Sequence, residues 1–157
     1  MIITVKKGVI LDEKADAIIL GQFVDAKYAH ELVETVAKED GFKPALGATL
    51  SVRTVGTLPA KRVIVVGLGD KKKFTDDSAR LAAAAALNAA KSVGAKKIAC
   101  ELFGSAKAMA EGATLANYEY GRYKSETKKK SPVSFDFVTD DGRVLRVAKD
   151  DVALGTL

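Results

Sequence analysis

Apolar residues along the 157-residue chain follow two spacings, one typical of strands and one typical of helices. Short apolar or alternating runs predict strands, because successive side chains of a strand point to opposite faces. The predicted strands are residues 2–5, 17–20, 49–55, 63–68, 98–102, 133–137 and, as an edge strand, 144–147. The run from Val63 to Leu68 is apolar almost throughout, which predicts an inner strand with helices on both faces.

Three further segments place apolar residues three or four positions apart, which predicts amphipathic helices. These helices cover residues 25–40, 75–93 and 105–122. In the first, Tyr28, Leu32 and Val36 form the apolar stripe and Asp25 is the candidate cap. Because strands and helices alternate, we expect a three-layer α/β sandwich with a mixed sheet, built as a single domain over residues 1–157.

Composition places the chain among ordinary globular domains, with 48% hydrophobic and 29% charged residues. No run approaches the roughly 20 apolar residues that cross a bilayer, and the first residues read as a strand rather than a signal peptide. Cys100 is the only cysteine, so no disulfide can form within the chain. We therefore expect a cytoplasmic protein in a reducing compartment, with no membrane partner.

The net charge of +5 is unevenly distributed, because residues 61–130 contain 15 Lys and Arg against 7 Asp and Glu. A basic segment can attract nucleic acid through its phosphates. It can equally form a solvated face or a surface that meets an acidic partner domain. Aromatic residues that could stack on bases are only sparsely interleaved with the basic ones. The charge pattern therefore favours a solvated face or a surface that meets a partner domain. A weak contact with nucleic acid remains the alternative.

A glycine-rich turn follows the apolar run that ends at Leu68 and precedes a predicted helix, an arrangement found in nucleotide-binding folds. The dinucleotide fingerprint needs a third glycine where Lys72 stands. The Gly-Lys-Ser/Thr of a P-loop is also missing. The residues predict at most a weak phosphate-binding turn, formed by Gly67, Gly69, Lys71 and Lys72.

No catalytic, cofactor-binding or metal-ligating set emerges from the remaining residues. His30 is the only histidine, which excludes a conventional Ser-His-Asp triad or a histidine-based metal site within one chain. Cys100 ends an apolar strand and is expected to be buried rather than reactive. Carboxylates scatter over predicted helix faces and turns, and the segment 139–144 reads as a turn.

Two segments resemble the amino-terminal domain of the leucyl aminopeptidase family, the cytosol aminopeptidases of peptidase family M17. Residues 41–69 contain Gly-Phe-Lys-Pro-Ala-Leu-Gly-Ala-Thr-Leu and then Leu-Pro-Ala-Lys-Arg-Val-Ile-Val-Val-Gly-Leu-Gly. Residues 110–125 read Ala-Glu-Gly-Ala-Thr-Leu-Ala-Asn-Tyr-Glu-Tyr-Gly-Arg-Tyr-Lys-Ser. Both match the family in the same order, and the predicted elements between them agree.

The resemblance implies a macrodomain-like sandwich that regulates or assembles a hexameric, metal-dependent leucyl aminopeptidase, an enzyme that removes amino-terminal residues from peptides. In that family a following catalytic domain binds two divalent metals, zinc or manganese, through a motif Asn-Thr-Asp-Ala-Glu-Gly-Arg. The motif does not occur in this chain. We therefore expect a fragment without catalysis or cofactor of its own, whose partner is the catalytic domain of the same polypeptide. The alternative is a DNA-binding or an ADP-ribose- or nucleotide-binding macrodomain-like module.

Overall fold

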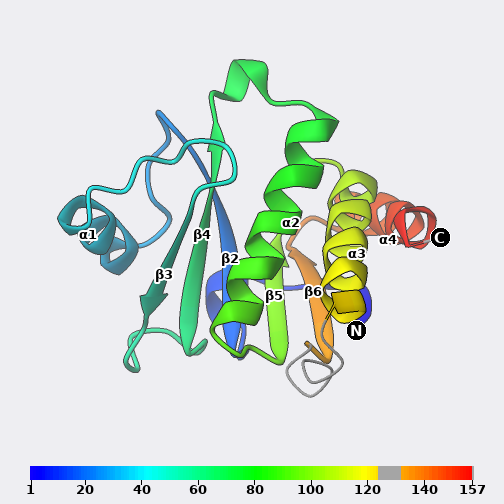
Figure 1. Ribbon diagram of the computed structural model, residues 1–157, viewed down its shortest axis with the longest axis horizontal. Coiled ribbons are helices and arrows are strands. Elements are labelled where there is room, and N and C mark those ends of the chain that lie inside the picture. Colours follow the sequence, from blue (N-terminus) through cyan, green and yellow to red (C-terminus); the bar gives the residue numbers. More distant parts are fainter. Residues whose placement is uncertain (124–131, 157) are drawn as a thin grey trace.

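A computed structural model describes residues 1–123 and 132–156, in which a single mixed sheet forms the middle of the molecule (Figure 1). Its strands are β1 (Ile2–Lys7), β2 (Ala17–Phe23), β3 (Thr49–Arg53), β4 (Arg62–Gly69), β5 (Lys97–Glu101) and β6 (Ser134–Thr139). They lie side by side in the order β1-β6-β5-β2-β4-β3. All neighbours are parallel except the edge strand β3, which runs antiparallel to β4. The sheet is therefore mixed, as predicted.

Helices cover both faces of this sheet. They are α1 (Glu31–Glu39), α2 (Asp76–Ser92), α3 (Ala106–Tyr123) and α4 (Gly142–Gly155), with short 3-10 turns η1 (Ile10–Asp12) and η2 (Lys71–Lys73). One face carries α2, α3 and α4, and the other carries α1 and η1 (Figure 1). None of the helices in the described residues has the length and apolarity that a membrane span requires.

The face under α2 and α3 is packed through small residues. Five alanines of α2 are completely buried against the sheet and α3: Ala79, Ala82, Ala83, Ala86 and Ala90. Gly112 of α3 lies directly on α2, because a Cβ added there would stand 2.2 Å from the carbonyl oxygen of Arg80. A glycine inside a helix costs about 1 kcal/mol relative to alanine. Here the close approach of the two helices requires it.

The opposite face is covered over only part of its width. Beneath α1 and η1 the sheet presents buried Ile18, Val63 and Val65. On β1 and β6 the same face carries polar residues beside the buried Val138, and Thr4 Oγ1 donates a 2.5 Å hydrogen bond to Asp136 Oδ1. The third layer is therefore shorter than the sheet that it covers.

The prediction of an edge strand at 144–147 was wrong, since these residues lie in α4. Asp141 caps this helix, and its Oδ1 accepts the backbone N–H groups of Arg143 at 2.9 Å and Val144 at 3.4 Å. Ala148 and Val152, four residues apart, are buried against the rest of the domain. Helix α4 also begins at Gly142, inside the segment 139–144 that the sequence predicts to be a turn, so the helix replaces the second half of that turn.

The first helix begins later than predicted, at Glu31. Its cap is His30 rather than Asp25, and the Nδ1 atom of His30 accepts the N–H of Leu32 at 3.1 Å. The histidine is half-buried in this position. Its structural role therefore lies in the helix cap.

Residue Val55 adopts a conformation that a valine rarely accepts. Its φ is 49°, Gly56 follows with φ 83°, and the Thr57 N–H donates to Thr54 O at 3.0 Å. Two consecutive left-handed residues form a tight turn of the kind that favours asparagine and glycine. A left-handed conformation costs an L-residue about 1–2 kcal/mol. The side chain is 89% exposed, so little packing offsets that cost.

We expect Val55→Asn to raise the free energy of unfolding by about 1 kcal/mol, because asparagine tolerates the left-handed region. Urea denaturation measures the change. Val9→Asn is the control, since Val9 is also exposed but lies in extended backbone, with φ −110°. An unchanged or lower stability of the Val55 variant would show that the turn holds no removable strain.

Candidate functional site

The carboxyl ends of five parallel strands meet at one edge of the sheet, uppermost in Figure 1. Ligands of open α/β sheets bind at this edge, where strands end and helices begin. The four predicted phosphate-binding residues lie there, at the end of β4 and in η2: Gly67, Gly69, Lys71 and Lys72. The amino termini of α2 and α3 also point to this edge. It is therefore the candidate site of the domain.

The two glycines of this turn hold a neighbouring loop. Gly67 N–H donates to Ala48 O at 2.7 Å, and Gly69 N–H donates to Pro44 O at 3.0 Å. A Cβ at Gly67 would lie 2.1 Å from Ala45 O, so loop 44–48 can approach only a glycine. In a phosphate cradle, such amides point at the anion instead. The Gly67 and Gly69 amides are consequently not available to a phosphate at this turn.

The lysines lie beside carboxylates and an aromatic ring. Asp70 Oδ1 accepts the Lys72 N–H at 3.0 Å, and Lys71 Nζ lies 6.0 Å from the centre of the Phe23 ring. A cavity of about 480 Å³ opens here, lined by Phe23, Asp25, Ala26, Asp70, Lys71 and Lys72. The two carboxylates oppose the two ammonium groups. The charged residues that line this cavity are thus two aspartates and two lysines.

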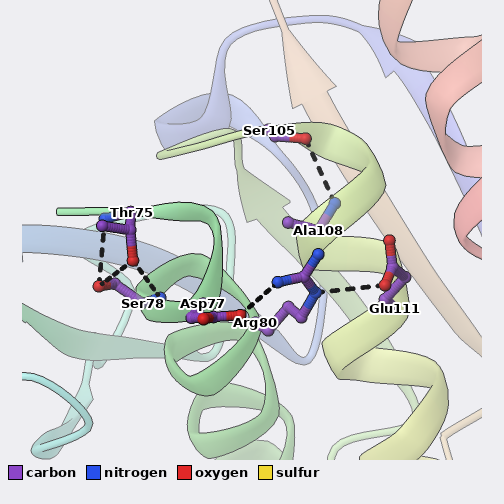
Figure 2. Close-up of polar contacts among 7 residues, drawn as sticks. All are labelled: Thr75, Asp77, Ser78, Arg80, Ser105, Ala108 and Glu111. Atoms are coloured by element: carbon purple, nitrogen blue, oxygen red, sulfur yellow. Dashed lines mark hydrogen bonds and ion pairs between the residues drawn. The ribbon is translucent and has the colours of Figure 1, made fainter.

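The amino termini of α2 and α3 are capped by their own side chains (Figure 2). Thr75 and Ser78 form a reciprocal capping box, in which the Ser78 N–H donates to Thr75 Oγ1 at 3.3 Å. The helix predicted over residues 75–93 is confirmed, with Thr75 as its N-cap. At α3, Ser105 Oγ accepts the Ala108 N–H at 3.3 Å. A capping side chain accepts a backbone N–H group that an anion would otherwise contact. At both helix termini, fewer free N–H groups are therefore left for a ligand.

Arg80 connects α2 with α3 in the same view (Figure 2). Its Nε atom lies 3.2 Å from Glu111 Oε2, and its Nη1 atom lies 2.5 Å from Asp77 Oδ1. The hydrogen bond to Glu111 is the main reason why the pKa of Arg80 is raised. Both carboxylates are thus engaged in ion pairs on the helix surface. They serve packing and solvation rather than proton transfer.

Glu101 is a residue at this edge that sequence reasoning did not single out. It ends β5, and its Oε1 accepts the Gly21 N–H at 2.6 Å. Burial raises its pKa to about 7, although the hydrogen bond from Gly21 lowers it. A carboxylate placed directly after the buried run Ile98–Cys100 was the available signal. Parallel pairing then withdraws it from water, which a strand pattern alone does not reveal.

A catalytic set does not form around these groups. Within residues 1–123 and 132–156, no three His, Cys, Asp or Glu side chains are grouped so that they could hold a metal ion. Cys100 is fully buried, as predicted, and that burial raises the pKa of its thiol. The residues of this part of the chain consequently do not fit the two-metal centre that the family resemblance implies for the catalytic domain.

The basic segment does not form one continuous patch in the described residues. Lys71–Lys73 lie at the carboxyl edge, whereas Arg62 and Lys97 begin β4 and β5 at the opposite edge. Lys91 is 3% exposed, and burial lowers its pKa to about 8. Lys128–Lys130 lie outside the described residues. Charge that is concentrated in sequence is therefore divided in space.

Comparison with known proteins identifies the chain by its sequence. The family model for the N-terminal domain of the cytosol aminopeptidase family matches residues 2–127. A probable cytosol aminopeptidase of Alkaliphilus oremlandii (strain OhILAs) is 28% identical over 145 residues, which cover 80% of this chain and 29% of that protein. The chain thus spans less than a third of the curated relatives that it matches first.

Solved structures agree on the fold. A mutant of tomato leucine aminopeptidase superposes with a TM-score of 0.72 at 24% identity, covering 95% of this chain and 35% of that one. A Trypanosoma brucei macrodomain in complex with ADP superposes with a TM-score of 0.67 at 13% identity, covering 94% and 67%. Both likenesses concern the fold alone and confirm the macrodomain-like sandwich. The family match confirms the resemblance seen at 41–69 and 110–125, and the chain belongs to the cytosol aminopeptidase family, to which it corresponds as the N-terminal domain.

Proposed function

We propose that residues 1–157 form one N-terminal domain that regulates or assembles a metal-dependent leucyl aminopeptidase. The family match over residues 2–127 is the observation that supports this most. In this proposal the catalytic domain of the same polypeptide binds two divalent metals, zinc or manganese, and cleaves amino-terminal residues from peptides. The parent enzyme is a cytoplasmic homo-hexamer. The domain itself supplies no catalytic residue and no cofactor.

The surface of the three-helix face suits an assembly role. Leu81 of α2 and Leu115 of α3 are 50% and 59% exposed, and they flank the groove that contains Arg80. On α4, Val147 and Leu154 are 61% and 57% exposed. Exposed aliphatic residues on adjacent helices suit contacts with a further domain or subunit. They support the proposal that this face is covered in the whole enzyme.

The chain alone should not hydrolyse leucine p-nitroanilide, with or without added zinc or manganese. Peptide hydrolysis by these metals needs ligands that hold the ion beside a water and the scissile carbonyl, and the described residues assemble none. Absorbance of released nitroaniline measures the activity. Metal-dependent turnover that persists through repurification and scales with the chain's concentration would contradict the proposal.

A chimaera tests the assembly role itself. In it, this chain replaces the matching N-terminal part of the Alkaliphilus oremlandii relative. The control is the same catalytic remainder without any N-terminal part. If the domain assembles the enzyme, light scattering should give a larger oligomer for the chimaera, together with higher activity. Equal mass and equal activity for both proteins would refute regulation and assembly alike.

The nucleotide-binding alternative has the macrodomain fold in its favour, since the Trypanosoma brucei neighbour is described in complex with ADP. We expect no binding of ADP-ribose tighter than roughly millimolar, about −4 kcal/mol, because loop 44–48 already occupies the Gly67 and Gly69 amides. Titration calorimetry measures it. A micromolar isotherm that Lys71→Ala with Lys72→Ala abolishes would favour the alternative. Gly67→Val is a poorer test, since it would displace loop 44–48.

The nucleic-acid alternative is supported by the basic segment. We expect weak binding without sequence preference that falls steeply with salt, as counterion release dictates, because the described lysines and arginines divide between two edges. Fluorescence anisotropy with labelled duplex DNA, first at about 50 mM and then at about 200 mM salt, measures the binding. Tight binding that survives the higher salt and is lost in Lys61→Ala with Arg62→Ala would establish a DNA-binding surface instead.

A further inference from the structure

A small cavity lies at the carboxyl edge of the sheet, near the ends of β1, β5 and β6. It differs from the cavity beside Lys71 and Lys72, with which it shares no lining residue. Its volume is about 270 Å³. It is smaller than the roughly 300–1,000 Å³ of a typical drug-sized site. The space suits a small ligand.

The charged side chains that line the cavity are both acidic, Glu101 and Asp140. Asp140 is exposed at the rim, whereas Glu101 is half-buried and reaches the Gly21 N–H at 2.6 Å. Within the described part of the chain, no lysine, arginine or histidine forms an ion pair with Glu101. Its charge is therefore desolvated without a compensating cation, which is unfavourable.

The neighbouring cation on β1 is already engaged. Lys6 Nζ lies 2.8 Å from Glu13 Oε2 and 3.9 Å from Asp136 Oδ2. Glu13 lies beside Gly8 of the cavity wall, since a Cβ at Gly8 would be 2.7 Å from Glu13 Oε1. Lys6 therefore pairs with two other carboxylates, and within the described residues no ion pair joins it to Glu101 or Asp140.

The remaining walls are apolar and are formed by Val9, Ile10, Leu102 and Val138. We propose that this cavity binds a small primary ammonium ion with a short apolar substituent, which Glu101 receives through charge-assisted hydrogen bonds. The ammonium supplies the missing cation, and the aliphatic walls contact the substituent. A free alkylamine and the amino terminus of a peptide share this chemistry. The inference rests on the cavity's geometry and charge, and does not depend on the proposed function.

Two-dimensional NMR of the chain at neutral pH tests the proposal, with isobutylamine as the probe. Saturable shifts are expected for the amides of Leu102 and Thr139, which line the cavity, and of Gly21, which donates to Glu101. Isobutanol and isovalerate, the neutral and anionic counterparts, should cause none of these shifts. Glu101→Gln should weaken isobutylamine binding at least tenfold. Glu31→Gln, an exposed glutamate on α1, is the matched control and should leave binding unchanged.

The peptide Leu-Gly-Gly separates the two sources of the ligand. Shifts of the same amides with similar affinity would identify peptide amino termini, and shifts with isobutylamine alone would identify free amines. The proposal is overturned if isobutylamine fails to bind, if isobutanol binds equally, or if Glu101→Gln has no effect. Should that variant not fold, Val9→Trp takes its place, since it fills the cavity from a half-exposed position. Undiminished binding to Val9→Trp also overturns the proposal.

Discussion

The packing of this domain depends on backbone segments that approach one another more closely than side chains normally permit. Gly112 of α3 rests on the Arg80 carbonyl of α2, and Gly155 of α4 rests on the Lys107 carbonyl of α3, where an added Cβ would lie 2.5 Å away. The three helices of one face are thus joined in succession by glycine contacts. Since interiors tolerate little change in volume, these contacts also fix where α2 and α3 begin at the carboxyl edge.

Much of this architecture is readable from local sequence, for physical reasons that differ between elements. The run Val63 to Leu68 predicted a strand buried on both faces, and residues 63–68 of β4 are all buried. The periodic pattern predicted a helix over residues 75–93, and α2 spans Asp76–Ser92 between the Thr75 cap and Gly94, which adopts φ 75°. Helix capping and strand burial depend on only a few neighbouring residues, so the local sequence pattern is enough to predict β4 and α2. α4 was missed because its amphipathic spacing acquires meaning only when its partner β1 is known.

The candidate site was predicted only in part, because its properties arise from contacts between distant segments. Gly67 and Gly69 lie against loop 44–48, and this contact between the turn and the loop cannot be recognised from the spacing of residues in the sequence. Glu101 has its unusual character because β2 lies beside β5, so that Gly21 donates across 80 residues of sequence. The absence of a histidine-based centre, in contrast, follows from counting residues. Amino-acid composition can exclude a type of catalytic centre, but it does not show where a binding site lies.

Loop 44–48 and the end of β4 depend on each other structurally. Ala45 and Ala48 contribute carbonyl oxygens, and Gly67 contributes the space and the N–H that they require. A side chain introduced at position 67 meets an unchanged loop, so replacing this glycine alone produces a clash with the Ala45 carbonyl. The two segments therefore constrain each other's variation, although about twenty residues separate them. Anyone grafting a new ligand-binding turn onto this scaffold has to transplant both pieces together.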